Sequence, residues 1–297
     1  MSNPKIIVRI LGGLGNQLFC YAAARRLALK SDAELVLDDV SGFSRDLLYQ
    51  RRYQLDHFRI PCRKATKAER LEPLPRLRRY LKRAINRHRP FELSNYIQQA
   101  GVDFDPRLLM LRPKGTLFLE GYWQSESYFK DVEETIRSDL RIIAPTDRNN
   151  VNVAKRIREC NGIAMHFRFF DSPKESGANN APRDYYKRAV AQMNRLFPDC
   201  HYFVFSDSPD RARGQIPLSD DRITMVTHNE GDENAYADLW LMTQCRHFII
   251  ANSTFSWWGS WLAENVDKQV IVPGLEKRSG KMWWGFEGLL PERWLKL

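Results

Sequence analysis

Residues 248–263, FIIANSTFSWWGSWLA, constrain the fold of this chain more than any other segment. The apolar run 248–251 has the length of a short buried strand, and hydroxyl and amide side chains follow where a helix is expected to begin. A helix start offers unpaired backbone N–H groups and the positive end of the helix dipole, and both favour an anion such as a phosphate. Plain N-capping is the alternative, since Ser and Thr begin many helices that bind nothing. The segment predicts a buried strand that leads into a polar helix start.

Two other apolar strands end in the same way. The strand at 163–166 runs into HFRFFD, which puts three polar side chains at its carboxyl end: His166, Arg168 and Asp171. The strand at 201–205 runs into Ser206 and Asp207. In an open parallel sheet, ligands bind at the carboxyl ends of the strands, so we expect these polar groups to converge. Together they predict a site for a nucleotide diphosphate, with Arg168 as the fixed positive group.

Strands and helices alternate through the second half of the chain. Strands are expected near 163, 201, 223, 248 and 269, and helices near 153, 183, 234 and 256, which is typical of a parallel doubly wound sheet. The first half opens with a strand at 5–10, a glycine turn, a helix at 17–30 and a strand at 34–37. Because 297 residues suffice for two domains of ordinary size, we place a boundary in the polar stretch 146–152.

Five segments in this order resemble motifs of the alpha-1,2-fucosyltransferases, glycosyltransferase family 11. They are GGLGNQLF at 12–19, GYWQSESYF at 121–129, HFRFFD at 166–171, FSD at 205–207 and LMTQCRHFIIANSTFSWWGSWL at 241–262. The resemblance implies an α/β fold of the GT-B type with two facing Rossmann-like domains. Residues 1–147 would form the N-terminal acceptor-side domain, with a basic helical insertion, and 148–297 the C-terminal GDP-sugar-binding domain.

The resemblance also implies the reaction. A galactoside alpha-1,2-fucosyltransferase moves L-fucose from GDP-fucose, with inversion, to the 2-hydroxyl of a terminal galactose-like residue, and we expect a role in bacterial surface polysaccharide synthesis. No cofactor beyond the donor substrate and no metal is expected. The implied catalytic residues are Arg168, His166 and Asp171, and the implied substrate-binding residues are Gly13, Asn16, Gln17, Asp207, Ser253, Thr254, Phe255 and Ser256. His166 and Asp171 would orient Arg168, and Asp207 would contact the guanosine.

One motif departs from the family pattern. The family usually shows HxRRGD, whereas this chain has Phe169 and Phe170 after Arg168. The second basic group is therefore missing, and the two rings are candidates for an apolar wall beside the methyl group of a deoxysugar. The general base stays open among three candidates: Asp171, Glu126 and Glu175. The three tryptophans of the last motif either stack on a ligand or form a buried cluster.

Two other functions compete with transfer. An NAD-dependent oxidoreductase would use the turn at 12–15 as its fingerprint, but Leu18 stands where the third glycine of GxGxxG belongs. A catalytically silent GDP-sugar or glycan-binding protein is the other alternative. Asp103 and Asp105 form a DxD pattern, yet Pro106 follows at once, which favours a solvated turn before a helix over a metal site.

Basic residues concentrate in one segment. Residues 59–89 contain twelve Lys or Arg and two Glu, a balance of +10 that equals the formal net charge of the chain. A solvated basic face, an anionic membrane or a lipid-linked glycan acceptor would each fit this segment, and nucleic acid fits least because few aromatics are interleaved. The start of the chain is a poor signal peptide, no stretch reaches the roughly 20 apolar residues of a membrane span, and the five cysteines lack metal spacing. We therefore expect a cytoplasmic protein with peripheral contact at the inner face of the membrane.

Overall fold

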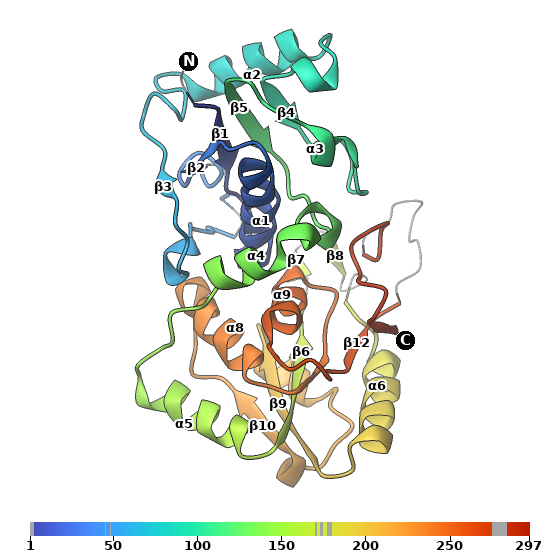
Figure 1. The fold of residues 1–297 in the computed structure, drawn as a ribbon. Helices are drawn as coiled ribbons and strands as arrows, with labels where there is room; N and C mark the ends of the chain where they lie inside the picture. The colour runs from blue at the N-terminus through green and yellow to red at the C-terminus, as the bar shows by residue number, and fades with distance from the viewer. Residues whose placement is uncertain are drawn as a thin grey trace. The chain divides into compact units, whose positions relative to one another are not determined.

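The chain folds into two compact units (Figure 1). The computed structural model describes residues 3–44, 46–47, 49–169, 171–172, 175–176, 180–274 and 284–297. Unit 1 comprises Met1–Arg141 and Phe286–Leu289, and unit 2 comprises Ile142–Gly285 and Leu290–Leu297. A short segment near the end of the chain thus belongs to the first unit. Among the described residues, no helix is both long and apolar enough to cross a bilayer.

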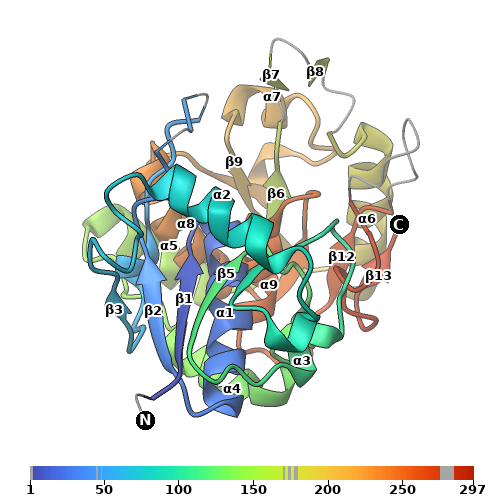
Figure 2. The same ribbon diagram turned by 90° about the horizontal axis from the view of Figure 1, so that it is seen from above.

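Unit 1 is built on a five-stranded sheet in the order β3-β2-β1-β5-β4, with parallel pairing between neighbours. Its strands are β1 (Lys5–Arg9), β2 (Glu34–Asp38), β3 (Arg63–Lys64), β4 (Tyr96–Gln98) and β5 (Thr116–Glu120). Its helices are α1 (Leu14–Lys30), α2 (Pro75–Asn86), α3 (Arg107–Met110) and α4 (Glu133–Asp139). Figure 2 shows α1 and α2 on opposite faces of this sheet.

The turn between β1 and α1 depends on one glycine. Gly12 has a φ of +78°, and a Cβ there would lie 2.9 Å from Nδ2 of Asn16, so only glycine fits without strain. Gly13 has an ordinary φ of −69° and is the N-cap of α1, which begins at Leu14, three residues before the predicted start. The β-α-β opening is confirmed, and the glycines serve the tight turn.

Unit 2 is built on a six-stranded sheet in the order β10-β9-β6-β11-β12-β13, also with parallel pairing between neighbours. Its strands are β6 (Asn161–Phe167), β9 (Cys200–Ser206), β10 (Ile223–Val226), β11 (His247–Ile249), β12 (Val270–Val272) and β13 (Leu295–Lys296). Its helices are α5 (Arg148–Arg158), α6 (Arg183–Leu196), α7 (Pro209–Arg213), α8 (Ala235–Thr243) and α9 (Thr254–Leu262). A separate antiparallel pair joins β7 (Asp171–Ser172) to β8 (Glu175–Ser176). The predicted alternation of strands and helices is confirmed.

The tryptophans of the last motif lie in the core of unit 2. Trp257, Trp258 and Trp261 are fully buried and pack against one another, and the ring centre of Trp294 lies 5.4 Å from that of Trp257. Of the two interpretations of these rings, the buried cluster is the correct one. The cluster anchors α9, and therefore fixes the place where that helix begins.

Candidate functional site

Three of the motif segments meet at one edge of the sheet in unit 2. Strand β6 lies between β9 and β11, and because the three run parallel, their carboxyl ends share an edge. Arg168 follows β6, Asp207 follows β9, and α9 begins five residues after β11 ends at Ile249. Segments up to 90 residues apart are in direct contact there. The predicted convergence is thus present within unit 2.

Asp207 positions Arg168. The Nη1 atom of Arg168 lies 2.9 Å from Oδ2 of Asp207, and the backbone N–H of Phe169 donates to Oδ1 of the same carboxylate at 3.1 Å. The side chain of Arg168 is 30% exposed, so the guanidinium is fixed and still reachable from solvent. This orienting role was expected of His166 and Asp171, and the structure adds Asp207 to them. The side chain of Asp171 lies outside the described residues, so its part in orienting Arg168 stays a prediction.

His166 is buried and neutral. Its Nδ1 lies 2.9 Å from Oγ of Ser256, and its ring centre lies 5.6 Å from that of Phe255. Burial, and to a lesser degree the charge of Arg168, lowers its pKa to about 3. A neutral imidazole beside Arg168 adds no second charge, so it acts as a spacer and hydrogen-bonding group that links the end of β6 to α9.

The start of α9 is capped by the side chain of its own N-cap residue. Ser253 is the N-cap, and its Oγ accepts a hydrogen bond from the backbone N–H of Phe255 at 3.3 Å. Thr254 and Phe255 are half-buried. Ser256 is fully buried, and its hydroxyl lies between His166 and the carbonyl of Ser253. Ser256 therefore has no exposed surface that could contact a ligand, and it positions His166. Ser253, Thr254 and Phe255 remain candidate substrate-binding residues.

Phe169 does not form an exposed wall. It is 6% exposed, and its ring stacks on that of Phe167 at a centre-to-centre distance of 6.4 Å within the core of unit 2. The expectation that Phe169 faces a deoxysugar methyl group is not supported by this packing, and Phe170 lies outside the described residues. The guanidinium carbon of Arg211, on α7, lies 4.2 Å from the centre of the Phe169 ring. The guanidinium of Arg211 therefore lies over Phe169, the position at which the family pattern has its second arginine.

Arg211 was not expected from the sequence. Its one signal there is its place in the helix that follows the strand ending at Ser206, and nothing in the spacing joins it to Phe169. The contact arises because β6 and β9 are neighbours in the sheet, so the segments that follow them pack together.

The site residues predicted in unit 1 have separate roles. Gln17 is fully buried: its Nε2 donates to the carbonyls of Gly12 and Arg52, and its Oε1 accepts from the backbone N–H of Gln54. It holds the glycine turn to the loop at 52–54 and has no surface to offer a substrate. Asn16 is half-buried, and its Oδ1 accepts from Nε2 of Gln124 at 2.8 Å. The motifs at 12–19 and 121–129 are therefore joined within unit 1.

The candidates for the general base are not equivalent. Glu126 is buried in unit 1, with 7% of its surface exposed, whereas the side chains of Asp171 and Glu175 lie outside the described residues. Glu126 would have to be uncovered before it could take a proton from an acceptor. The choice among the three remains open.

A second polar cluster was not foreseen. Asn229, which follows β10, and Asn150, near the start of α5, form two reciprocal hydrogen bonds of 2.8 and 2.9 Å between their amides. Asn229 also donates to Oδ1 of Asp238 at 2.8 Å. Burial raises the pKa of Asp238 to about 7, although the hydrogen bond from Asn229 opposes this shift. A carboxyl group that titrates near neutral pH at the ligand-binding edge of a sheet is a functional candidate.

Asp105 hydrogen-bonds to the first residue of helix α3. Its carboxylate accepts from the backbone N–H of Arg107 at 3.0 Å and pairs with the guanidinium of the same residue. Within the described parts of the chain, no group of three or more His, Cys, Asp or Glu is placed to hold a metal ion. Metal independence stays a prediction.

Known proteins resemble this chain over most of its length. A family model described as Glycosyl transferase family 11 matches residues 78–279. An alpha-1,2-colitosyltransferase of Escherichia coli is 26% identical over 316 residues, which cover 98% of each chain. An O-antigen biosynthesis glycosyltransferase of Escherichia coli, WbnK, is 28% identical over 289 residues, which cover 88% of this chain and 91% of WbnK.

Solved structures show the fold. The alpha-1,6-fucosyltransferase NodZ soaked with GDP-fucose superposes with a TM-score of 0.51 at 16% identity, covering 88% of this chain and 93% of NodZ. At that identity the likeness speaks for the fold alone. Two α/β units with parallel sheets and this structural neighbour confirm the predicted GT-B type.

Proposed function

The chain belongs to glycosyl transferase family 11, and from that premise we propose that it transfers L-fucose from GDP-fucose to the 2-hydroxyl of a terminal galactose-like residue. The proposed reaction inverts the configuration at the sugar carbon, uses no cofactor and serves the synthesis of a bacterial surface polysaccharide. The names of the two relatives support the proposed alpha-1,2 linkage and the proposed role in surface polysaccharide synthesis. One is named an alpha-1,2-colitosyltransferase and the other an O-antigen biosynthesis glycosyltransferase.

One observation carries the proposal. Arg168 is fixed by Asp207 at the ligand-binding edge of the sheet in unit 2 and remains partly exposed. When the bond from the sugar to GDP breaks, negative charge grows on the leaving diphosphate. A guanidinium that is already in place stabilises this charge without reorganising during the reaction. Ser253 and Thr254, at the start of α9, would add hydrogen bonds to the same phosphates.

Other residues of unit 2 support Arg168 in this proposal. Asp207 holds Arg168 and would also contact the guanosine of the donor, and Arg211 supplies the second positive group that the family pattern places at Phe169. His166 keeps the end of β6 at a fixed distance from α9 through Ser256. Asp171 would contribute from the segment that follows.

Unit 1 would bind the acceptor. The Asn16 and Gln124 amides, held together by their hydrogen bond, offer donors and acceptors suited to sugar hydroxyls. Gly13 caps the helix that carries Asn16, and its carbonyl accepts from the backbone N–H of Asn16 at 2.9 Å. The acceptor hydroxyl loses its proton to a carboxylate, for which Asp171, Glu126 and Glu175 are the candidates.

The decisive experiment measures transfer directly. Purified protein is incubated with labelled GDP-fucose and a panel of beta-galactosides, and a second set uses nucleotide-activated colitose because one relative is named for that sugar. The expected product is a fucosylated galactoside from which a fucosidase specific for alpha-1,2 bonds releases fucose, whereas fucosidases specific for other linkages do not. Donor binding without any transfer across the panel would instead support the silent binding protein.

A further inference from the structure

Helix α2 has its polar face inside and its apolar face outside. Its buried residues are Arg79 and Asn86. The guanidinium of Arg79 pairs with Asp38 at 2.8 Å and also donates to Ser41 and to the carbonyl of Arg70. These contacts hold the helix to unit 1 through polar groups, which is the reverse of ordinary helix packing.

A second arginine strengthens the attachment. Arg83 lies one turn after Arg79, and its Nη2 lies 2.9 Å from one oxygen of Glu120 and 3.1 Å from the other. The face that holds α2 in place therefore contains two ion pairs. Asn86 adds hydrogen bonds to Asn95 on the same face.

The opposite face carries a row of exposed apolar side chains, which we call the α2 row: Leu74, Leu77, Leu81 and Ile85. Their exposed fractions lie between 49% and 65%, and their spacing of three or four residues places them along one side of the helix. Tyr80, 66% exposed, extends the row on one flank. Four large apolar residues aligned in this way form a surface that water solvates poorly.

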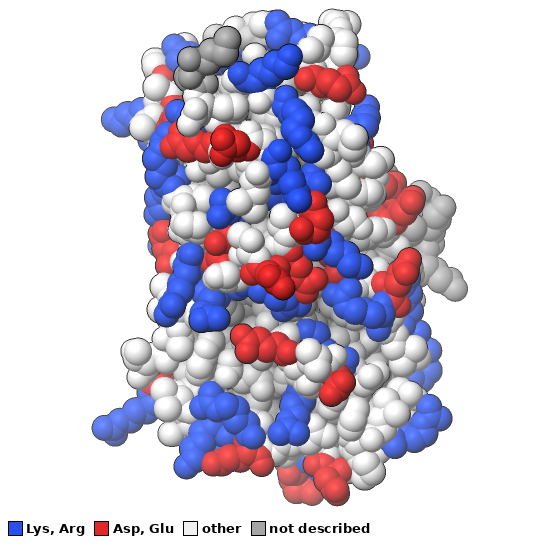
Figure 3. Space-filling view, viewed as in Figure 1, with Lys and Arg blue, Asp and Glu red and all other residues white. Residues whose placement is uncertain are grey.

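Arginines that form no ion pair with a described residue border the α2 row, and we call them the arginine rim; Arg78 among them donates to the carbonyl of Glu72. No acidic residue stands between Pro73 and Phe91. Four basic side chains of this stretch form no ion pair with any described residue: Arg76, Arg78, Arg87 and Arg89. Figure 3 shows Lys and Arg side chains beside uncharged surface at the top of the molecule, where Figure 1 places α2.

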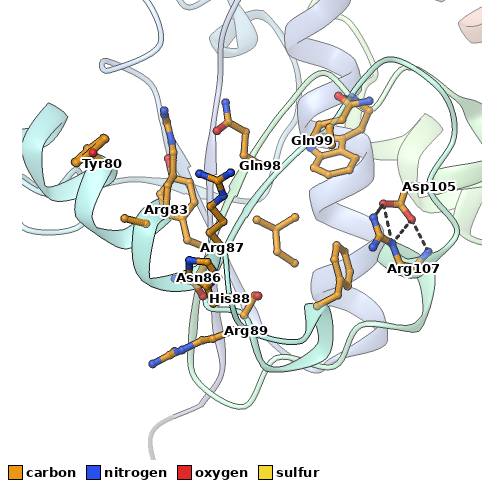
Figure 4. A pocket seen from close by; sticks show the side chains of 17 residues that line it. Tyr80, Arg83, Asn86, Arg87, His88, Arg89, Gln98, Gln99, Asp105 and Arg107 are labelled. Carbon is orange, nitrogen blue, oxygen red and sulfur yellow. Dashed lines mark hydrogen bonds and ion pairs between the residues drawn. The ribbon is translucent and has the colours of Figure 1, made fainter.

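A pocket lies along one flank of α2. It has a volume of about 700 Å³ and is lined in part by Tyr80, Ala84 and Arg87 of this segment and by Phe91 and Gln98 across from it. Figure 4 shows Arg83 and Arg87 next to Gln98 in this pocket. Arg83 is engaged by Glu120 and Arg107 by Asp105, so Arg87 and Arg89 are the arginines of the pocket that form no ion pair with a described residue.

We propose that α2 docks unit 1 on an anionic phospholipid bilayer. The α2 row enters the boundary between head groups and acyl chains, the bordering arginines contact acidic head groups, and Arg87 takes a head-group phosphate at the pocket. An amphipathic helix with a basic rim is the kind of element that lies in a membrane interface. This inference gives the membrane contact expected of residues 59–89 a defined surface, and it deepens the proposed function by bringing the enzyme to a membrane-borne acceptor.

Two other occupants fit less well. A second copy of the chain, paired through the same surface, would bring the two arginine rims together, and like charges would repel. A nucleic acid would satisfy the arginines but would leave the α2 row against water or phosphate. A bilayer satisfies both parts of the surface.

Vesicle sedimentation tests the proposal. The full chain should sediment with vesicles that contain phosphatidylglycerol, and much less with pure phosphatidylcholine. The variant Leu77→Gln, Leu81→Gln, Ile85→Gln should lose at least tenfold in apparent affinity, because these side chains are the inserted ones. Its matched control changes three exposed apolar residues elsewhere, Leu47→Gln, Met110→Gln and Val266→Gln, and should bind like the original protein.

The arginine rim has its own test. The variant Arg76→Gln, Arg78→Gln, Arg87→Gln should lose about fivefold for each arginine removed, and the loss should shrink as salt is raised. An equal change of charge at Lys114, Arg148 and Lys187 is the control. Arg79 and Arg83 are left intact, since they hold the helix in place.

Several outcomes would overturn the inference. Sedimentation of the α2 row variant at the original level would reject insertion, and equal binding to both lipids would reject the role of the rim. A shift from dimer to monomer in light scattering, with vesicle binding unchanged, would identify the surface as a contact between copies. Transfer to a dissolved galactoside should be the same in all variants, so failure of the proposed reaction would show in that assay and not in sedimentation.

Discussion

At the scale of single residues, the candidate site consists of polar side chains that are held by other polar side chains. Arg168 depends on Asp207, and His166 depends on Ser256. Each pair joins segments that are far apart in the sequence. The properties of these groups are therefore set by their partners, and substitutions at the partner positions are informative.

Arg168→Ala should lower turnover roughly a hundredfold to a thousandfold, the usual cost of removing one donor that stabilises charge in the transition state. Asp207→Asn should lower it less, because the guanidinium remains but is no longer fixed. Steady-state kinetics with near-ultraviolet circular dichroism as a check of folding would measure both. Original turnover in a folded Arg168→Ala protein would remove the assigned role.

Arg211→Gln should raise the KM for the donor by roughly tenfold, since charge-assisted hydrogen bonds contribute about 1.5–3 kcal/mol. The control is Arg213→Gln, a change of equal charge on the same helix. Donor titration with each variant gives the comparison. An equal effect of the two changes would show that net charge matters and that the place of Arg211 over Phe169 does not.

Asp238 should make the protein less stable as pH rises. Its pKa is about 7 in the folded chain, against an ordinary 3.8, so between these values the folded state holds a proton that the unfolded state has released. The free energy of unfolding therefore falls with rising pH across this window. Asp238→Asn should flatten this part of the profile in urea unfolding at pH 4.5 to 7.5. An unchanged slope in the variant would contradict the buried, protonated carboxyl.

At the scale of elements, the strands that carry the site could be predicted from sequence. The runs that became β6, β9 and β11 are short, continuous and apolar, as expected of strands covered on both faces. Their parallel order then brings their carboxyl ends together. The start of α9 could be predicted as well, because hydroxyl residues mark helix starts.

The orientation of α2 could not be predicted. Periodicity showed that Leu77, Leu81 and Ile85 share a side of the helix, but it does not say which side packs. That choice depends on Asp38 and Glu120, which lie 41 and 37 residues from their arginine partners. The same applies to Asp207 and Arg211, whose partners Arg168 and Phe169 follow a different strand, β6.

Ser253→Ala should destabilise the protein by about 1 kcal/mol, since it removes the side-chain cap of α9. Ser253→Thr keeps an oxygen in place and is the control. Urea unfolding measures the loss, and donor affinity should fall in parallel if the helix start binds phosphate. A loss of stability with unchanged donor affinity would assign Ser253 to capping alone.

At the scale of the whole molecule, each unit has its own parallel sheet and its own core. In the proposed reaction, charge on the leaving group would be met by Arg168 and by the start of α9, both in unit 2, so we expect no need for a metal ion. A chelator should leave the transfer rate nearly unchanged. Loss of activity that manganese or magnesium restores would bring Asp103 and Asp105 back as metal ligands.

The described tryptophans are distributed unequally between the two units, so intrinsic fluorescence reports mainly on one of them. Of those that the structure describes, Trp123 alone belongs to unit 1, and six belong to unit 2: Trp240, Trp257, Trp258, Trp261, Trp284 and Trp294. Intrinsic fluorescence during heating would therefore follow the melting of unit 2 almost alone, whereas far-ultraviolet circular dichroism follows both sheets. Any separation between the two melting curves would measure how far one unit survives the loss of the other.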